Sequence, residues 1–227
     1  MRTAVFDLDG TLADTSADLL AAANVSLGEA GHGAPLGPQD ASVAFRGGRA
    51  MLRAGLGRVS GAEADEAEVN RLYPRLLEAY GAGICVETRL YPGALEVLDR
   101  LAADGWILAV CTNKPIGLAR VLLDRLGIAG RFRAVLGADS LPIRKPHPGH
   151  LMETIKQAGG RREASVLIGD TETDRKTARN AGVPCVLVGF GPEGEAVARM
   201  EPDAVLARYA DLPDLLETLV QFPRRAI

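Results

Sequence analysis

Two acidic residues near the start of the sequence, Asp7 and Asp9, are separated by one residue and followed by Gly10. They come directly after residues 3–6, an apolar run with β-branched and aromatic side chains that predicts a buried strand. A turn at Gly10 lets the two carboxylates diverge, although they would share a face of a continuing strand. Paired carboxylates suit a hard cation such as Mg2+, which keeps water and substrate oxygens in its shell. The pattern therefore predicts metal-assisted chemistry.

The same acidic pattern also occurs in ordinary turns and at the start of calcium-binding loops. A calcium loop of the EF-hand type has glycine at its sixth position and glutamate at its twelfth. Counted from Asp7, the fourth position is Gly10 and the twelfth is Asp18. The calcium loop is thus excluded, whereas an ordinary turn stays open on these residues alone.

From Tyr91 onward, short apolar strands alternate with helical patterns, which is typical of a parallel sheet with crossover helices. We expect helices over residues 93–103, 118–126, 148–158, 173–181 and 212–220, and strands over residues 106–111, 134–136, 165–168, 185–188 and 204–206. If residues 3–6 join this sheet, the fold is α/β, with a doubly wound, Rossmann-like parallel sheet as its core.

Residues 14–86 carry only helical patterns, separated by proline and glycine. Helices are expected over about residues 14–27, 43–56 and 64–80. These positions predict a small all-helical domain inserted after the first strand. The expected domains are therefore an α/β core of residues 1–13 and 87–227 and a helical cap of residues 14–86.

Polar side chains follow four of the predicted strands. These side chains are Asp7 and Asp9, then Thr112, Asn113 and Lys114, then Lys145, and finally Asp170 with Asp174. Each group also has a simpler role as a helix cap, a solvated charge or a partner of a helix dipole. Because ligands of open parallel sheets bind beyond the carboxyl ends of the strands, four such groups favour one shared site. Acids, hydrogen-bond donors and an ammonium together suit a phosphate and its metal.

The combined set resembles the four motifs of the haloacid dehalogenase superfamily of phosphohydrolases. The matching strings are Asp7-Leu8-Asp9-Gly10-Thr11, Thr112-Asn113-Lys114-Pro115, Lys145-Pro146-His147-Pro148, and Gly169-Asp170 with Asp174. The helical insert is similar to the cap of the phosphatases related to phosphoglycolate phosphatase. Two further strings, Tyr91-Pro92-Gly93 and Ala178-Arg179-Asn180-Ala181-Gly182, resemble that family as well. Outside the motifs, Gly189-Phe190-Gly191-Pro192 departs from the glycine-tyrosine pair usual in the family.

The resemblance implies an enzyme, a Mg2+-dependent phosphoric monoester hydrolase for a small phosphorylated metabolite, with 2-phosphoglycolate as the first candidate. It implies that Asp7 attacks phosphorus and forms an aspartyl-phosphate. Asp9 would protonate the leaving alkoxide and then deprotonate the hydrolytic water.

The resemblance also assigns the remaining core residues. Thr112, Asn113 and Lys145 would bind the transferring phosphoryl oxygens. Mg2+ would be held by Asp7, the backbone carbonyl of Asp9 and Asp170, with Asp174 as a further ligand or as a hydrogen-bonding partner of the ligands.

Selectivity is expected to come from the cap, since a core that binds only phosphate and metal cannot distinguish esters. The candidate residues are Arg46, Gly47, Gly48 and Arg49, where two glycines permit close backbone approach between two arginines. The place of this loop resembles the substrate-specificity loop of the family. An arginine or the glycine amides would bind a substrate carboxylate, although solvated helix-surface arginines remain the alternative.

Composition indicates a globular protein: of 227 residues, 47% are hydrophobic and 24% charged. The formal net charge of −3 provides no field that attracts nucleic acid or a membrane, so neither partner is expected. The three cysteines are odd in number and far apart, which predicts reduced thiols. With no apolar signal segment before residues 3–6, we expect a cytoplasmic protein, either a monomer or a homodimer.

Two other functions stay open at this point. A phosphosugar mutase of the beta-phosphoglucomutase type would share the core and differ mainly in the cap. A non-catalytic phosphoacceptor or binding protein would also use an aspartate, a hydroxyl and a lysine, but would need neither a cap nor Asp9. Phosphate release beyond one equivalent distinguishes a phosphatase from the non-catalytic class.

Overall fold

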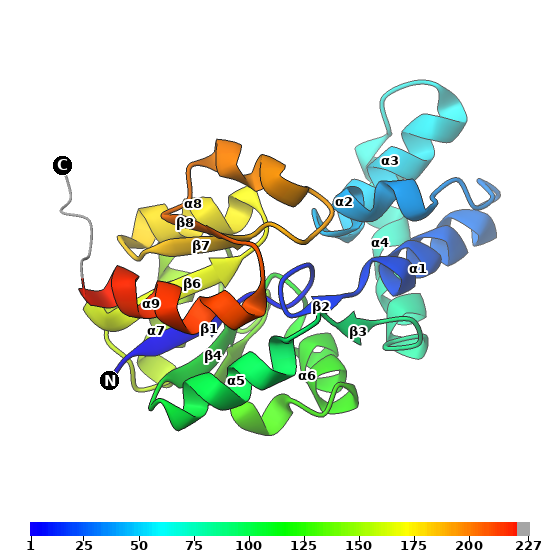
Figure 1. The fold of residues 1–227 in the computed structure, drawn as a ribbon. Helices are drawn as coiled ribbons and strands as arrows, with labels where there is room; N and C mark the ends of the chain where they lie inside the picture. Colours follow the sequence, from blue (N-terminus) through cyan, green and yellow to red (C-terminus); the bar gives the residue numbers. More distant parts are fainter. Residues whose placement is uncertain (222–227) are drawn as a thin grey trace. The chain divides into compact units, whose positions relative to one another are not determined.

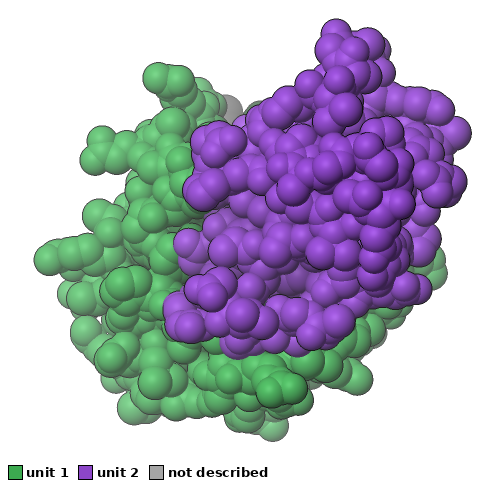
Figure 2. Space-filling view, turned by 90° about the vertical axis from the view of Figure 1, so that its right-hand side faces the viewer, with its two compact units in different colours: residues 1–13, 90–227 green, residues 14–89 purple. Residues whose placement is uncertain are grey.

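The computed structural model describes residues 1–221, and the chain forms two compact units (Figures 1 and 2). The first, which we call the core unit, contains residues 1–13 and the chain from residue 90 onward. The second, the helical unit, contains residues 14–89. The predicted cap range of residues 14–86 lies within the helical unit.

The core unit is built on a six-stranded sheet in the order β5-β4-β1-β6-β7-β8, in which all paired neighbours run parallel. The strands are β1 (Thr3–Phe6), β4 (Ile107–Cys111), β5 (Ala134–Leu136), β6 (Ser165–Gly169), β7 (Cys185–Val188) and β8 (Ala204–Leu206). From β1 the chain first builds the sheet outward through β4 and β5. It then returns to the other side of β1 and continues through β6 to β8. The predicted doubly wound α/β fold is confirmed.

Helices cover both faces of this sheet (Figure 1). They are α5 (Ala94–Ala103), α6 (Ile116–Arg125), α7 (Pro148–Gln157), α8 (Glu172–Ala181) and α9 (Leu212–Gln221). Alternate strand residues, such as Val5, Ala109 and Leu167, form a buried cluster with residues of α7 and α8. Because side chains alternate along a strand, the intervening residues face the opposite side, where α5 and α9 contact the sheet and each other. Burial on both faces explains why these strands are almost wholly apolar in sequence.

The helical unit consists of α1 (Ser16–Glu29), α2 (Ala41–Ala44), α3 (Gly48–Ser60) and α4 (Glu66–Ala82), with a short 3-10 turn at Pro38–Asp40. The single helix predicted over residues 43–56 is wrong, because the chain breaks between α2 and α3. Gly47 has a φ of 96°, a left-handed value that L side chains rarely adopt. The start of α4 follows a local rule, since the Asp65 side chain accepts a hydrogen bond from the Ala67 N–H at 3.0 Å.

Two short strands not expected from the sequence, β2 (Ala13–Asp14) and β3 (Arg89–Leu90), pair where the chain passes between the units. Within the helical unit, the buried carboxylate of Asp18 binds residues 86–88, near the end of the unit. It accepts hydrogen bonds from the backbone N–H groups of residues 86–88 and from the Thr88 hydroxyl, at 2.7–3.0 Å. The beginning and the end of the helical unit are thus joined by one side chain.

Two expectations drawn from composition can be compared with this structure. Cys85, Cys111 and Cys185 are all free thiols, as predicted, and the last two are buried in β4 and β7. Across residues 1–221, no helix combines the length and apolar character that crossing a membrane requires.

Candidate active site

The register of the sheet places the ends of its central strands side by side. Phe6, the last residue of β1, lies opposite Val110 of β4 and Ile168 of β6. The next residue, Asp7, still donates its backbone N–H to the Ile168 carbonyl at 2.8 Å. Asp7 therefore projects from the carboxyl edge of the sheet at the centre of the strand order. This is the position where open parallel sheets bind ligands.

Lys145 links two of the predicted acids. Its Nζ lies 2.9 Å from Asp7 Oδ2 and 2.6 Å from Asp174 Oδ1, and its side chain is only 1% exposed. The Lys145 carbonyl accepts a hydrogen bond from the Asn113 amide at 3.0 Å. Asn113, predicted to face the phosphate, thus also holds the backbone that carries the lysine. Lys145 is a buried ion-pair residue, and the alternative of a solvated loop charge is wrong.

Burial and crowding shift the pKa values in this cluster. Burial raises the pKa of Asp7 from 3.8 to about 6, with a further upward contribution from Asp174, while Lys145 acts in the opposite direction. The pKa of Asp170 is raised well above its usual value by burial and by the charges of Asp174 and Asp7. Burial lowers the pKa of Lys145, but Asp174 and Asp7 outweigh it, so the net shift is upward. Three carboxylates lie close together around one ammonium, so ionising all three at once is unfavourable.

Asp174 organises the loop before α8. One oxygen binds Lys145, and the other accepts hydrogen bonds from the Thr171 hydroxyl at 2.6 Å and the Thr171 N–H at 3.1 Å. This is a capping box, so the predicted helix-terminal role of Asp174 is also real. A Cβ at Gly169 would lie 2.4 Å from Asp174 Cγ, so glycine is what permits this close approach. Thr11 orients the neighbouring acid, donating its hydroxyl to Asp170 at 2.8 Å.

The acidic cluster has the donor set of a divalent-cation site. Ligand oxygens of Asp7, Asp170 and Asp174 all lie within 4.8 Å of one another. All three residues are buried, and Lys145 is the cation that pairs with two of them. Three carboxylates against one ammonium leave an excess of negative charge, which a divalent cation would balance. The residues therefore fit Mg2+. Asp9 is expected to contribute its backbone carbonyl, and its side chain is not part of this cluster of carboxylates.

Asp9 pairs instead with a lysine that was part of a sequence motif but was not predicted as a site residue. Lys114 Nζ lies 2.7 Å and 2.8 Å from the two oxygens of Asp9. The signal was present in the sequence, since Lys114 follows Thr112 by two positions at a strand end. Thr112 itself is buried, and its hydroxyl oxygen accepts the Lys114 N–H at 3.2 Å.

The four predicted specificity residues all belong to the helical unit, at the α2–α3 junction. The Arg49 guanidinium lies 3.8 Å from the centre of the Tyr73 ring and donates to the Asn70 side chain at 3.2 Å. A Cβ at Gly48 would lie 2.8 Å from the same tyrosine ring, so its small size serves the packing of α3 on α4. Arg49 is therefore oriented by its own unit, rather than being only a solvated surface charge.

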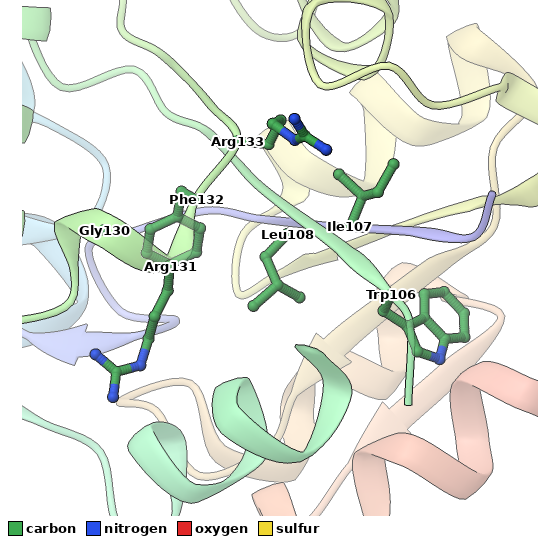
Figure 3. Close-up of a pocket in the computed structure, with 7 residues that line it drawn as sticks. All are labelled: Trp106, Ile107, Leu108, Gly130, Arg131, Phe132 and Arg133. Carbon is green, nitrogen blue, oxygen red and sulfur yellow. The ribbon is translucent and has the colours of Figure 1, made fainter. Parts of the chain in front are cut away.

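A surface hollow of about 250 Å3 lies elsewhere on the core unit (Figure 3). It is lined by residues 106–108, at the start of β4, and residues 130–133, just before β5. Arg131 and Arg133 point in different directions there, and Arg131 pairs with Asp99 at 2.7 Å. These segments lie at the amino ends of the strands, so the hollow is separate from the acidic cluster.

Comparison with known proteins places this arrangement in a family. The family model described as haloacid dehalogenase-like hydrolase matches residues 4–188. A phosphoglycolate phosphatase of Agrobacterium fabrum is 41% identical over 219 residues, covering 96% of this chain and 93% of that protein. One from Caulobacter vibrioides is 40% identical, with 96% and 92% covered.

Solved structures agree. A predicted phosphoglycolate phosphatase from Haemophilus somnus has a TM-score of 0.83 and 28% identity, covering 95% of this chain and 97% of that one. The fold and the family model lead to the same assignment. The chain has a six-stranded sheet with acids at its carboxyl edge, and the model matches most of the chain. The protein therefore belongs to the haloacid dehalogenase-like hydrolase family and is an enzyme of the hydrolase class.

Proposed function

We propose that this protein hydrolyses small phosphate monoesters with Mg2+ as cofactor, and that 2-phosphoglycolate is the first substrate to test. The observation that carries the proposal is the buried cluster of Asp7, Lys145, Asp170 and Asp174 at the carboxyl edge of the sheet. The names of the relatives, which are phosphoglycolate phosphatases, support the choice of substrate.

Mg2+ would be held by the carboxylates of Asp7 and Asp170 and the backbone carbonyl of Asp9. When bound, it would offset charge on the phosphoryl oxygens and on the nucleophile. Asp174 contributes in another way, because its carboxylate already accepts hydrogen bonds from Lys145 and Thr171. Its proposed role is to orient the lysine and the loop that carries Asp170, rather than to bind the metal directly.

In the first step, an oxygen of Asp7 attacks phosphorus as the bond from phosphorus to the leaving oxygen breaks. The product is an aspartyl-phosphate, and protonated Asp9 gives its proton to the departing alkoxide. Lys145, held between Asp7 and Asp174, places a positive charge beside the nucleophile and the arriving phosphoryl group. Thr112 and Asn113, at the end of the neighbouring strand, are proposed to donate to the phosphoryl oxygens.

In the second step, water attacks phosphorus and the bond from phosphorus to Asp7 breaks. Asp9, now a carboxylate, accepts the proton from water, and inorganic phosphate leaves. Each residue returns to its starting state, so turnover continues beyond one equivalent. A phosphoacceptor protein would stop after the first step.

The helical unit is proposed to provide selectivity through Arg46, Gly47, Gly48 and Arg49. A guanidinium or a glycine N–H can bind a substrate carboxylate by charge-assisted hydrogen bonds. The stacking of Arg49 on Tyr73 supports this role, because it restricts the side chain before any ligand binds.

The test is release of inorganic phosphate from a panel of small phosphate esters, with Mg2+ and with a chelator. Sustained Mg2+-dependent release, fastest with 2-phosphoglycolate, is expected. Transfer of phosphate between sugar hydroxyls without release would instead support the mutase. Release limited to one equivalent would support a phosphoacceptor.

A further inference from the structure

The ion pair between Lys114 and Asp9 differs in geometry from the other lysine contact in the site. Lys145 lies 2.9 Å from an oxygen of Asp7 and 2.6 Å from an oxygen of Asp174, whereas Lys114 contacts both oxygens of one carboxylate, Asp9, at 2.7 Å and 2.8 Å. The Lys114 side chain is 3% exposed and that of Asp9 is 17% exposed. An ammonium that lies between both oxygens fixes the direction in which the carboxylate points.

The backbone of Lys114 is itself held from two sides. Its N–H donates to the Thr112 hydroxyl at 3.2 Å, and its carbonyl accepts the Ala138 N–H at 2.9 Å. A Cβ at Gly137 would lie 2.6 Å from the Lys114 carbonyl oxygen, so the loop after β5 closes tightly on this segment. Ile116, the first residue of α6, is fixed in turn by the Asp139 side chain at 2.7 Å. The backbone that carries the Lys114 side chain is therefore held in place by its neighbours.

From this geometry we infer that Lys114 is a positioning residue for Asp9, holding its carboxylate where it exchanges a proton with the leaving oxygen and then with water. The inference rests on the proposed function, since it gives Asp9 the role of acid and base. A buried ion pair is weak evidence of stabilisation, because desolvation of both charges opposes their attraction. Proton transfer, by contrast, requires heavy atoms within about 2.6–3.2 Å, so orientation of Asp9 has a direct consequence for rate.

The contact is compatible with both proton transfers. When Asp9 carries the proton, one oxygen bears it and the other accepts from Lys114. Donation of that proton to the leaving oxygen gives the carboxylate, which then accepts from Lys114 through both oxygens, as in the structure. The proton later taken from water restores the first state. Lys114 neither gains nor loses a proton in this cycle.

The experiment compares the wild type with Lys114→Met, Asp9→Asn and the double variant. Each is assayed on an alkyl phosphate, which has a poor leaving group, and on p-nitrophenyl phosphate, which has a good one. Lys114→Met is expected to lower kcat/KM, which reports the step that expels the leaving group, about 10- to 100-fold on the alkyl ester and less than about 3-fold on the aryl ester. KM and inhibition by inorganic phosphate should stay within about 2-fold of the wild type. The double variant should be no slower than Asp9→Asn, because Lys114 acts through Asp9.

Lys156→Met is the matched control, since this lysine lies on the surface with a side chain that is 78% exposed. It is expected to match the wild type on both esters. If Lys114→Met unfolds at the assay temperature, Lys114→Gln removes the positive charge but keeps N–H donors, and a smaller loss confined to the alkyl ester is expected.

Equal losses in kcat/KM on both esters, or additive losses in the double variant, would overturn the inference and leave Lys114 a structural residue. Weaker inhibition by inorganic phosphate would also overturn it, since Lys114 would then bind phosphate itself. Failure of the proposed function has a different signature. In that case the wild type releases no phosphate from any ester, before any variant is compared.

Discussion

The ammonium of Lys145 lies 2.9 Å from Asp7, in a site where the lysine side chain is 1% exposed. The same nitrogen contacts Asp174 at 2.6 Å, so one positive charge separates two buried carboxylates. The nucleophile proposed for the reaction is thus oriented before substrate or metal arrives. Removing the lysine leaves both carboxylates buried without this cation.

Lys145→Met should therefore destabilise the metal-free protein. We expect the free energy of unfolding to fall by about 3–5 kcal/mol, because Asp7 and Asp174 lose the cation between them. Urea unfolding in the presence of EDTA measures this change. The surface substitution Lys156→Met, at a side chain 78% exposed, should change the value by less than about 0.5 kcal/mol. Similar effects of the two substitutions would contradict the account of Lys145.

Asp7→Asn tests the nucleophile. The amide has nearly the same size as the carboxylate but cannot form the aspartyl-phosphate, so turnover should fall to the background rate. The far-ultraviolet circular dichroism spectrum should be unchanged. Substantial activity of a purified Asp7→Asn protein on p-nitrophenyl phosphate would rule out the covalent mechanism.

Binding of Mg2+ should stabilise the folded protein, independently of activity. At a metal concentration about 100 times the dissociation constant, the gain is about 2.7 kcal/mol and raises the melting temperature. Asp170→Asn removes one charge from the acidic cluster and should reduce this shift strongly. Calorimetric titration of the metal gives the affinity directly. A melting temperature insensitive to Mg2+ in the wild type would contradict the metal site.

The raised pKa of Asp7 predicts a pH dependence of stability in the metal-free protein. Its pKa is about 6 when folded, compared with an ordinary value of 3.8, so the unfolded chain releases this proton at lower pH. The contribution to stability is complete below about pH 4 and is lost as the pH rises to about 6. The shift of roughly two units corresponds to about 3 kcal/mol.

This contribution is isolated by comparing urea unfolding of the wild type and Asp7→Asn in EDTA between pH 4 and pH 7. The wild type should lose stability relative to the variant as the pH rises. Excess Mg2+ should abolish the difference, because the metal favours the ionised carboxylate. A difference that is constant with pH would show that Asp7 titrates normally.

The arginines of the helical unit should affect one class of substrate only. A hydrogen bond to a charged group contributes about 1.5–3 kcal/mol, so loss of the arginine that binds a substrate carboxylate should lower kcat/KM about 10- to 150-fold. Arg46→Ala and Arg49→Ala are compared on 2-phosphoglycolate and on p-nitrophenyl phosphate, which lacks the carboxylate. Equal effects of each variant on both substrates would exclude arginine recognition.

Much of the core could be predicted because parallel strands place their carboxyl ends together. The apolar runs ending at Asp7 and before Asp170 were sufficient to expect two acids at one edge, and the structure brings them within one cluster. A local pattern could not show that Lys114 reaches Asp9, since they are 105 residues apart in sequence. That contact depends on the pairing of β1 with β4.

The misplaced helix over residues 43–56 has a local cause. Apolar side chains continue at helical spacing on both sides of Gly47, and periodicity alone does not register a change of backbone direction. The left-handed φ of 96° at that glycine ends the pattern. Similarly, β2 and β3 are two residues each, too short for alternation to be recognised.

The hydrogen bonds that Asp18 accepts from residues 86–88 have a practical consequence for engineering. Because these hydrogen bonds join the first helix of the unit to its last residues, the helical unit holds its own two ends together. Residues 14–89 could therefore be exchanged as a cassette for the insert of a relative that carries its own aspartate and its own turn of donor N–H groups at these two places. Such chimaeras would test the proposed role of the helical unit, since substrate preference is then expected to follow the insert and the chemistry to follow the core unit.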